Sequence, residues 1–150
     1  MELSYVSRNL RKTISFKDIV SNPFLDNETK RVNLSTQAAT LTNQSDVFNN
    51  SLKKISIKSK DAYQPKTIEI AIILKLLSSN LRRVHNISPS SRVQIVSTLI
   101  AFLKESSPYS IHRFDIKNFY ESIDTSKIVH KLKKQGKVSK KSRNLVEAYL

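Results

Sequence analysis

The sequence predicts an α+β fold that is predominantly helical. The 150 residues include one glycine and four prolines, and such a scarcity of turn residues argues against a β-sandwich with many tight turns. Residues 65–84 repeat apolar side chains at the three- and four-residue spacing of a helix. Residues 109–116 are rich in aromatic and β-branched side chains, which is typical of a strand. A chain of this length can bury a core of its own.

Residues 1–60 are predicted to form an N-terminal helical extension. Residues 3–20 are expected to be helical in two pieces, the second opened by a capping box of Ser15 and Asp18. The first piece would place three apolar residues on one face: Leu3, Val6 and Leu10. Residues 28–41 predict a further helix whose inward residues would be Val32, Ala38 and Leu41. Ile55 and Ile57 alternate with polar residues, which favours a short strand or one arm of a hairpin.

Residues 61–108 are predicted to form a second, helical region. The helix from Thr67 to about Val84 has apolar residues on two sides, which indicates a buried helix. A second, amphipathic helix is expected after Ser91, with its apolar face formed by Val93, Val96, Leu99, Ile100 and Leu103. In residues 109–150 the predicted strand Tyr109–Ile116 is followed by a helix that Asp124 caps and Gly136 ends, and by a last helix from Ser139. That helix ends inside its apolar pattern, so we expect a continuing chain or a partner that completes the fold.

The balance of charge points to an anionic partner. Lysine and arginine number 26 against 12 acidic residues, which gives a net charge of +14. A nucleic-acid backbone is the expected partner, since each contact with a phosphate releases condensed counterions. An anionic membrane surface would instead require a basic amphipathic helix with large exposed apolar residues, and a basic surface without any ligand is the remaining alternative. The chain has no cysteine and no apolar N-terminal signal, so we expect a cytoplasmic protein with no membrane partner.

A single carboxylate, Asp115, ends the predicted strand, and the aromatic pair Phe119-Tyr120 follows it four and five residues later. The run from Tyr109 to Asp124 reads Tyr-Ser-Ile-His-Arg-Phe-Asp-Ile-Lys-Asn-Phe-Tyr-Glu-Ser-Ile-Asp. This run resembles motif A of prokaryotic reverse transcriptases of the retron, group II intron and abortive-infection or phage-defence types. The resemblance extends over roughly residues 61–135. It implies RNA-directed DNA synthesis, with a role in antiviral defence as one possibility.

The resemblance implies roles for residues of the motif. Asp115 would be the catalytic carboxylate and first ligand of Mg²⁺, and the backbone carbonyl of Ile116 would touch the same metal; both are hard oxygen donors, which Mg²⁺ prefers. Tyr120 would exclude a 2′-hydroxyl from the sugar of the incoming nucleotide. The substrates would be an RNA template in a duplex and deoxynucleoside triphosphates. The fold implied is that of fingers helices over 61–108, then the first strand and helix of a right-hand palm over 109–150, which would be incomplete.

The stretch from Asn80 to Val96 resembles the fingers region of the defence-type enzymes. No acidic residue occurs between Glu69 and Glu105. Arginine forks suit phosphate oxygens, so Arg83 or Arg92 is predicted to lie near the template or the incoming triphosphate. The alternative for these arginines is ordinary solvated charge at helix ends.

The chain departs from the family in one respect, because it contains no Asp-Asp pair and hence no Tyr-x-Asp-Asp hairpin. Catalysis by the isolated chain is therefore not expected, and a complementing polymerase segment or subunit would be required. Asp124 is predicted to be a helix cap and not a second ligand. The rival hypothesis is a non-catalytic basic RNA-binding module or a degenerate remnant of a polymerase. A peripheral membrane protein is a third alternative.

Overall fold

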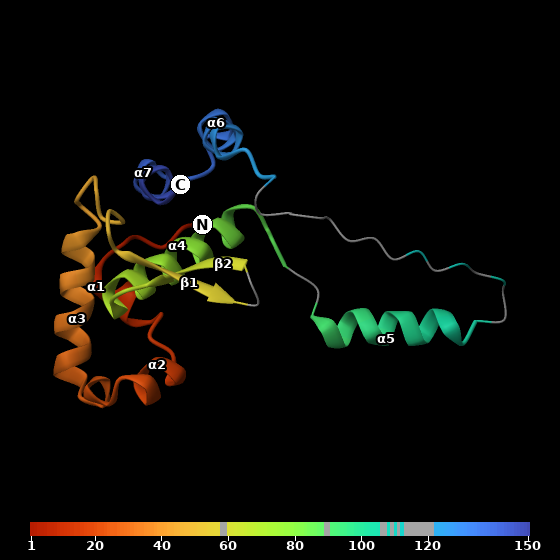
Figure 1. Cartoon of the computed structure of the whole chain (residues 1–150), viewed down its shortest axis with the longest axis horizontal. Coiled ribbons are helices and arrows are strands. Elements are labelled where there is room, and N and C mark those ends of the chain that lie inside the picture. Colours follow the sequence, from red (N-terminus) through yellow and green to blue (C-terminus); the bar gives the residue numbers. More distant parts are fainter. Residues whose placement is uncertain (58–59, 89–90, 106–107, 109, 111, 113–121) are drawn as a thin grey trace.

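A computed structural model describes residues 1–57, 60–88, 91–105, 108, 110, 112 and 122–150. Over these residues the fold is mostly helical α+β, with seven α-helices, one 3-10 helix and one two-stranded hairpin, as the sequence predicts (Figure 1). The elements in chain order are α1 (Ser7–Arg11), α2 (Phe16–Ser21), η1 (Pro23–Asp26), α3 (Glu28–Leu41), β1 (Leu52–Ile57), β2 (Lys60–Pro65), α4 (Ile68–Val84), α5 (Arg92–Leu103), α6 (Thr125–Gln135) and α7 (Lys140–Tyr149).

The central element is α4, which contacts α1, α3, β2 and α7 (Figure 1). Its buried residues confirm the two-sided apolar pattern, and they are Ile70, Ile72, Ile73, Leu76, Leu77 and Asn80. Strands β1 and β2 pair antiparallel, with Leu52 opposite Pro65 and Ile57 opposite Lys60. The alternating isoleucines therefore belong to a hairpin arm, one of the two predicted structures.

Local capping signals account for most of the helix starts. Ser15 and Asp18 form the predicted capping box of α2, and Ser91 forms a second box with Gln94 at the start of α5. Thr67 caps α4, and its hydroxyl accepts a hydrogen bond from the backbone N–H of Ile70. Gly136 ends α6 in the left-handed conformation, with φ of 61°, which glycine adopts without the strain of a Cβ atom.

The prediction of a helix beginning at Leu3 is wrong, because α1 begins at Ser7. The backbone of Leu3 is bound instead by a side chain 77 residues away. The Leu3 N–H donates to Asn80 Oδ1 at 2.9 Å, and Asn80 Nδ2 donates to the Leu3 carbonyl oxygen at 2.8 Å. We call this pair of hydrogen bonds between Asn80 and Leu3 the clamp. A helix at Leu3 would have to replace both bonds, so the clamp holds the N-terminal segment in its non-helical conformation against α4.

The buried face of α3 also differs from the prediction. The helix spans Glu28–Leu41 as expected, and Ala38 is buried and Leu41 half-buried against the core, as predicted. Val32, however, is 36% exposed, whereas Leu34 and Ser35, which were not predicted to face inward, are buried. The Oγ atoms of Ser7 and Ser35 lie 2.8 Å apart in the contact between α1 and α3. The helix is therefore oriented by small residues and a partly buried hydroxyl pair, which a search for apolar spacing overlooks.

Helix α7 packs on the core through Leu145 and Val146. The Tyr5 hydroxyl and Ser142 Oγ are hydrogen-bonded at 2.8 Å in this interface, and burial raises the pKa of Tyr5 above its usual value. The rings of Phe48 and Tyr149 meet edge to face, with their centroids 5.6 Å apart. These contacts join the C-terminal helix to the N-terminal segment and to the loop after α3.

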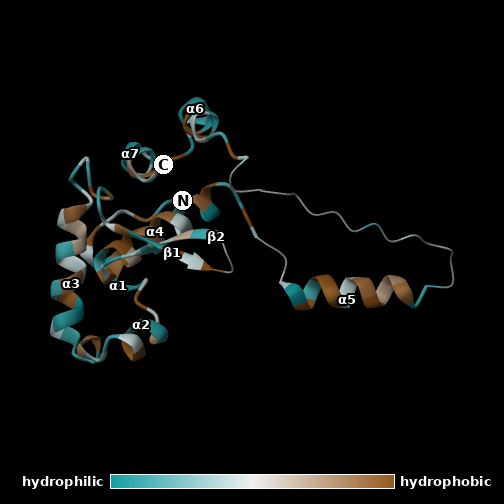
Figure 2. Cartoon of the chain, in the orientation of Figure 1, coloured by the Kyte–Doolittle hydropathy of each residue, from teal (hydrophilic) through white to brown (hydrophobic). Residues whose placement is uncertain are grey.

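Helix α5 spans the predicted residues but lacks the predicted burial. It contacts no other described helix or strand, and its large apolar side chains are 39–74% exposed. Figure 2 shows that its ribbon is apolar over most of its length while it stands apart from the other helices. The inward face expected for Val93, Val96, Leu99, Ile100 and Leu103 is therefore exposed in this structure.

The predicted strand Tyr109–Ile116 falls almost wholly outside the described residues. Ser110 and His112, which are described, belong to no strand. Within the described part of the chain, no helix is long and apolar enough to cross a bilayer.

Candidate nucleic-acid interface

The residues to which the resemblance assigns contacts with the metal and the sugar are not among those that the structure describes. Asp115, Ile116 and Tyr120 all lie outside the described residues. Among the residues that are described, no group of three or more histidine, aspartate or glutamate side chains could hold a metal ion. The described part of the candidate site therefore consists of basic side chains on α4, α5 and α6.

Asp124 is a helix cap, as predicted. Its carboxylate accepts hydrogen bonds from the backbone N–H groups of Ser126 and Lys127, at 3.0 and 3.3 Å, at the start of α6. A bond of 2.6 Å from the Ser126 hydroxyl is the main cause that holds the pKa of Asp124 below its usual value. These bonds engage one carboxylate oxygen, and Lys127 Nζ lies 3.4 Å from the other.

Arg83 lies in the last turn of α4, where it lines a groove of about 660 Å³ that follows one side of the helix. The groove is also lined by Lys75, Ser78, Ser79 and Arg82, and by Pro65 of the hairpin. Arg82 and Arg83 are exposed, and neither forms an ion pair with a described carboxylate. Two free guanidinium forks beside serine hydroxyls suit the oxygens of a phosphate backbone.

Lys75, which lines the same groove, is already paired. Its Nζ contacts the carboxylate of Asp18, which is also part of the α2 capping box. Burial acts to raise the pKa of Asp18, but the hydrogen bonds from Lys75 and Ser15 outweigh it and leave the pKa lowered. Lys75 therefore fixes α2 against α4, which leaves the two arginines as the cations available to a ligand.

Arg92, the other predicted phosphate contact, is the first residue of α5 and is exposed. The structure does not bring it together with Arg83, because α5 makes no contact with α4. Both arginines are at helix ends, but Arg83 is at the C-terminal end of one helix and Arg92 at the N-terminal end of the next.

Helix α6 carries a second basic surface, which we call the α6 basic face: Lys127, His130, Lys131 and Lys134. Helical spacing puts these four exposed residues on one side of the helix, opposite the half-buried Ile128 and Leu132. Lys131 and Lys134 pair with no described carboxylate, whereas Lys133, on the flank, forms a 2.9 Å ion pair with Glu147 of α7. Residues 127–143 contain no acidic residue, and the helix geometry shows that Lys131 and Lys134 share this face whereas Lys133 lies on the flank toward α7.

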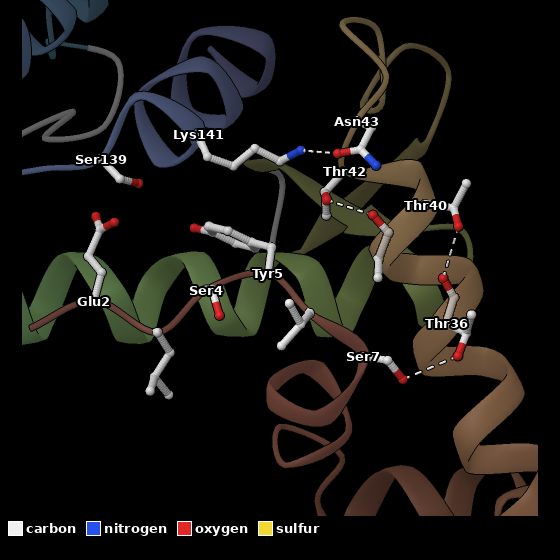
Figure 3. A pocket seen from close by; sticks show the side chains of 13 residues that line it. Glu2, Ser4, Tyr5, Ser7, Thr36, Thr40, Thr42, Asn43, Ser139 and Lys141 are labelled. Atoms are coloured by element: carbon white, nitrogen blue, oxygen red, sulfur yellow. Dashed lines mark hydrogen bonds between the residues drawn. The ribbon is translucent and has the colours of Figure 1, made fainter.

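A cavity of about 730 Å³ lies between residues 2–7, α3 and the start of α7 (Figure 3). Hydroxyl groups in its lining form hydrogen bonds with one another: Thr36 Oγ1 of α3 and Ser7 Oγ of α1 lie 3.2 Å apart. Lys141 Nζ donates to Asn43 Oδ1 at 2.5 Å, and burial lowers the pKa of this lysine. Sequence reasoning missed this cavity, because its residues come from three distant segments and share no motif.

Comparison with protein-family models, with curated proteins and with solved structures finds no match to this chain.

Proposed function

We propose that this chain is the front part of a reverse transcriptase, comprising fingers helices and the beginning of the palm. The observation that carries the proposal is the run Tyr109–Asp124, with one carboxylate at position 115 and an aromatic ring five residues later. In this proposal Asp115 and the Ile116 carbonyl hold Mg²⁺, which neutralises the triphosphate of the incoming deoxynucleotide. The Tyr-x-Asp-Asp hairpin comes from a complementing segment or subunit.

The exposed basic residues support the nucleic-acid part of the proposal. Arg82 and Arg83 line a groove on α4, and the α6 basic face follows Asp124 directly along the chain. In the proposal these surfaces bind the phosphates of the template duplex without reading its sequence. The second candidate function is a non-catalytic RNA-binding module, which the same α6 basic face and the net charge of +14 favour.

The discriminating experiment is Tyr120→Ala in the polypeptide or complex that contains the Tyr-x-Asp-Asp hairpin. If Tyr120 excludes the 2′-hydroxyl by steric contact, its removal should raise ribonucleotide incorporation relative to deoxynucleotide incorporation by about 10-fold or more. Primer extension with each nucleotide type measures the ratio. Tyr120→Phe keeps the ring and should leave discrimination unchanged. Equal discrimination in all three proteins would remove Tyr120 from the site, and absence of any primer extension in the unsubstituted complex would favour the RNA-binding module.

The α6 basic face can be tested on the chain itself. Replacing Lys131 and Lys134 with alanine should weaken RNA binding and reduce the slope of log K against log salt by about one to two, because each lysine–phosphate contact releases counterions. Fluorescence anisotropy with labelled RNA at several salt concentrations measures both quantities. The matched control is Lys30→Ala with Lys53→Ala, which removes the same charge from exposed positions on α3 and β1. Equal loss in both double variants would show that net charge, and not this face, determines binding.

A further inference from the structure

Helix α5 is a helix that its own sequence cannot stabilise in isolation. It has 12 residues, and helices shorter than about 12–15 residues are marginal in water without tertiary packing. Between Arg92 and Lys104 it carries no charged residue. Its polar residues, Gln94, Ser97 and Thr98, fall on one side together with Ala101, whereas Val96, Leu99 and Leu103 are central to a broad apolar face on the other. All of these side chains are exposed in this structure.

An unfilled apolar groove lies elsewhere on the same chain. Its volume is about 520 Å³, and its walls come from the C-terminal half of α4, from α6 and from α7. Leu74, Leu77 and Leu81 form one wall, and Val146, Tyr149 and Leu150 form another. Tyr149 is 43% exposed and Leu150 50% exposed, so large apolar surfaces remain open to water here as well. The polar lining residues, Ser78 and Arg82, are those that the groove shares with the basic side of α4.

We propose that α5 docks in this groove of its own chain, with Val96, Leu99 and Leu103 facing α4 and α7. Both of the segments that flank α5 in the sequence border the groove. Ile87, five residues before Arg92, lines it, and so does Ile128, in the first turn of the helix that follows.

Chain length permits this docking. Five residues span at most about 17 Å when extended, and the 12 residues of α5 are about 18 Å long, so the short connection keeps the helix within reach of the groove. The connection from Leu103 to Thr125 is long enough that it does not restrict where α5 can dock. A tethered helix has an effective concentration in the millimolar range, which favours the helix of the same chain over that of a second copy.

Engineered cysteines test the proposal cleanly, because the chain has no cysteine of its own. The test variant is Ser78→Cys with Leu99→Cys, in which a disulfide would connect the groove to the apolar face of α5. The matched control is Ser78→Cys with Gln94→Cys, which joins the groove to the polar side. A disulfide requires Cα atoms about 4.4–6.8 Å apart, so the docked helix should cross-link only through position 99. Circular dichroism of the reduced proteins checks that both variants keep the helical fold.

The expected result is an intramolecular disulfide in the test variant that forms about tenfold faster than in the control. It is measured by gel mobility and by mass spectrometry of a monomer isolated by size exclusion. A covalent dimer through the same pair would overturn the proposal in favour of a helix exchanged between two copies. Equal rates in the two variants, or no disulfide in either, would overturn it by showing that α5 does not occupy the groove.

Discussion

Replacing Asp115 with asparagine should reduce nucleotide incorporation by about 1,000-fold or more, which corresponds to about 4 kcal/mol of lost transition-state stabilisation. Asparagine has the shape of aspartate but lacks the negative charge that binds a divalent cation, so the metal that neutralises the triphosphate would be lost. The measurement is single-nucleotide primer extension by the polypeptide or complex that carries the Tyr-x-Asp-Asp hairpin. RNA binding by the variant should be unchanged, because the phosphate contacts are assigned to lysines and arginines.

Asp124→Asn is the matched control for this experiment. It makes the same chemical change nine residues further along, at a carboxylate that caps α6. Asparagine caps a helix as well as aspartate does, so both the stability of α6 and nucleotide incorporation should be retained. Full activity in Asp115→Asn would exclude Asp115 as a metal ligand. Equal loss in both variants would mean that the effect comes from local structure and not from a missing ligand.

The elements that sequence analysis placed correctly are those whose signals are local. The apolar spacing within 65–84 predicts α4, and Thr67, Ser15, Asp124 and Gly136 act at the helix ends where they stand. A cap depends on a side chain and a backbone group two or three residues apart, so no tertiary information is required to find it. Strand β1 follows for the same reason, because alternation of apolar and polar residues is also a local pattern, but its partner β2 was not predicted.

The features that sequence analysis missed depend on contacts between distant segments. Nothing near Leu3 indicates that its backbone will bind a side chain at position 80, and nothing near Val32 indicates that the Ser35 hydroxyl will pair with that of Ser7. Periodicity predicts which side of α5 is apolar but not what covers it. In the candidate site, the sequence predicts that Arg83 and Arg92 are near helix ends, and only the fold shows that Arg83 and its neighbour Arg82 line a groove.

The proposed docking of α5 and the proposed function of the arginines are connected. The apolar groove and the basic groove share Leu74, Ser78 and Arg82, so they are adjacent along α4. A helix seated in the first would begin, at Arg92, within a short distance of Ile87 and the end of α4. Docking would therefore increase the positive charge beside Arg82 and Arg83, and a chain with α5 cross-linked in the groove should bind RNA at least as tightly as the reduced protein.

Asn80→Ala should destabilise the chain by about 2–4 kcal/mol, the largest stability effect that we expect from a single polar substitution. The Asn80 side chain is fully buried, and its amide makes both hydrogen bonds to the backbone of Leu3. Alanine would leave the N–H and carbonyl groups of Leu3 without partners on the surface of α4, and each unmade bond costs about 1–3 kcal/mol. Urea denaturation followed by circular dichroism measures the change in the free energy of unfolding.

Asn80→Asp tests whether the loss of stability expected for Asn80→Ala comes from the hydrogen bond that Asn80 donates to the Leu3 carbonyl oxygen. An ionised carboxylate cannot donate that bond, and burial without a cationic partner raises the pKa of the introduced carboxyl group above the ordinary value of about 3.9. Because the folded-state pKa is raised, the free energy of unfolding of the variant should fall furthest below that of the unsubstituted protein at neutral pH. The difference should shrink as the pH falls through that pKa, where the carboxyl group regains a proton to donate.

The matched control is Asn9→Asp, because Asn9 Nδ2 donates to the Ser4 carbonyl oxygen at 2.9 Å in an exposed bond on the same N-terminal segment. Solvent replaces that bond, so the control should lose less than about 1 kcal/mol with little dependence on pH. A pH-independent deficit in Asn80→Asp, or equal deficits at the two positions, would refute the clamp as the contact that holds the N-terminal segment on α4.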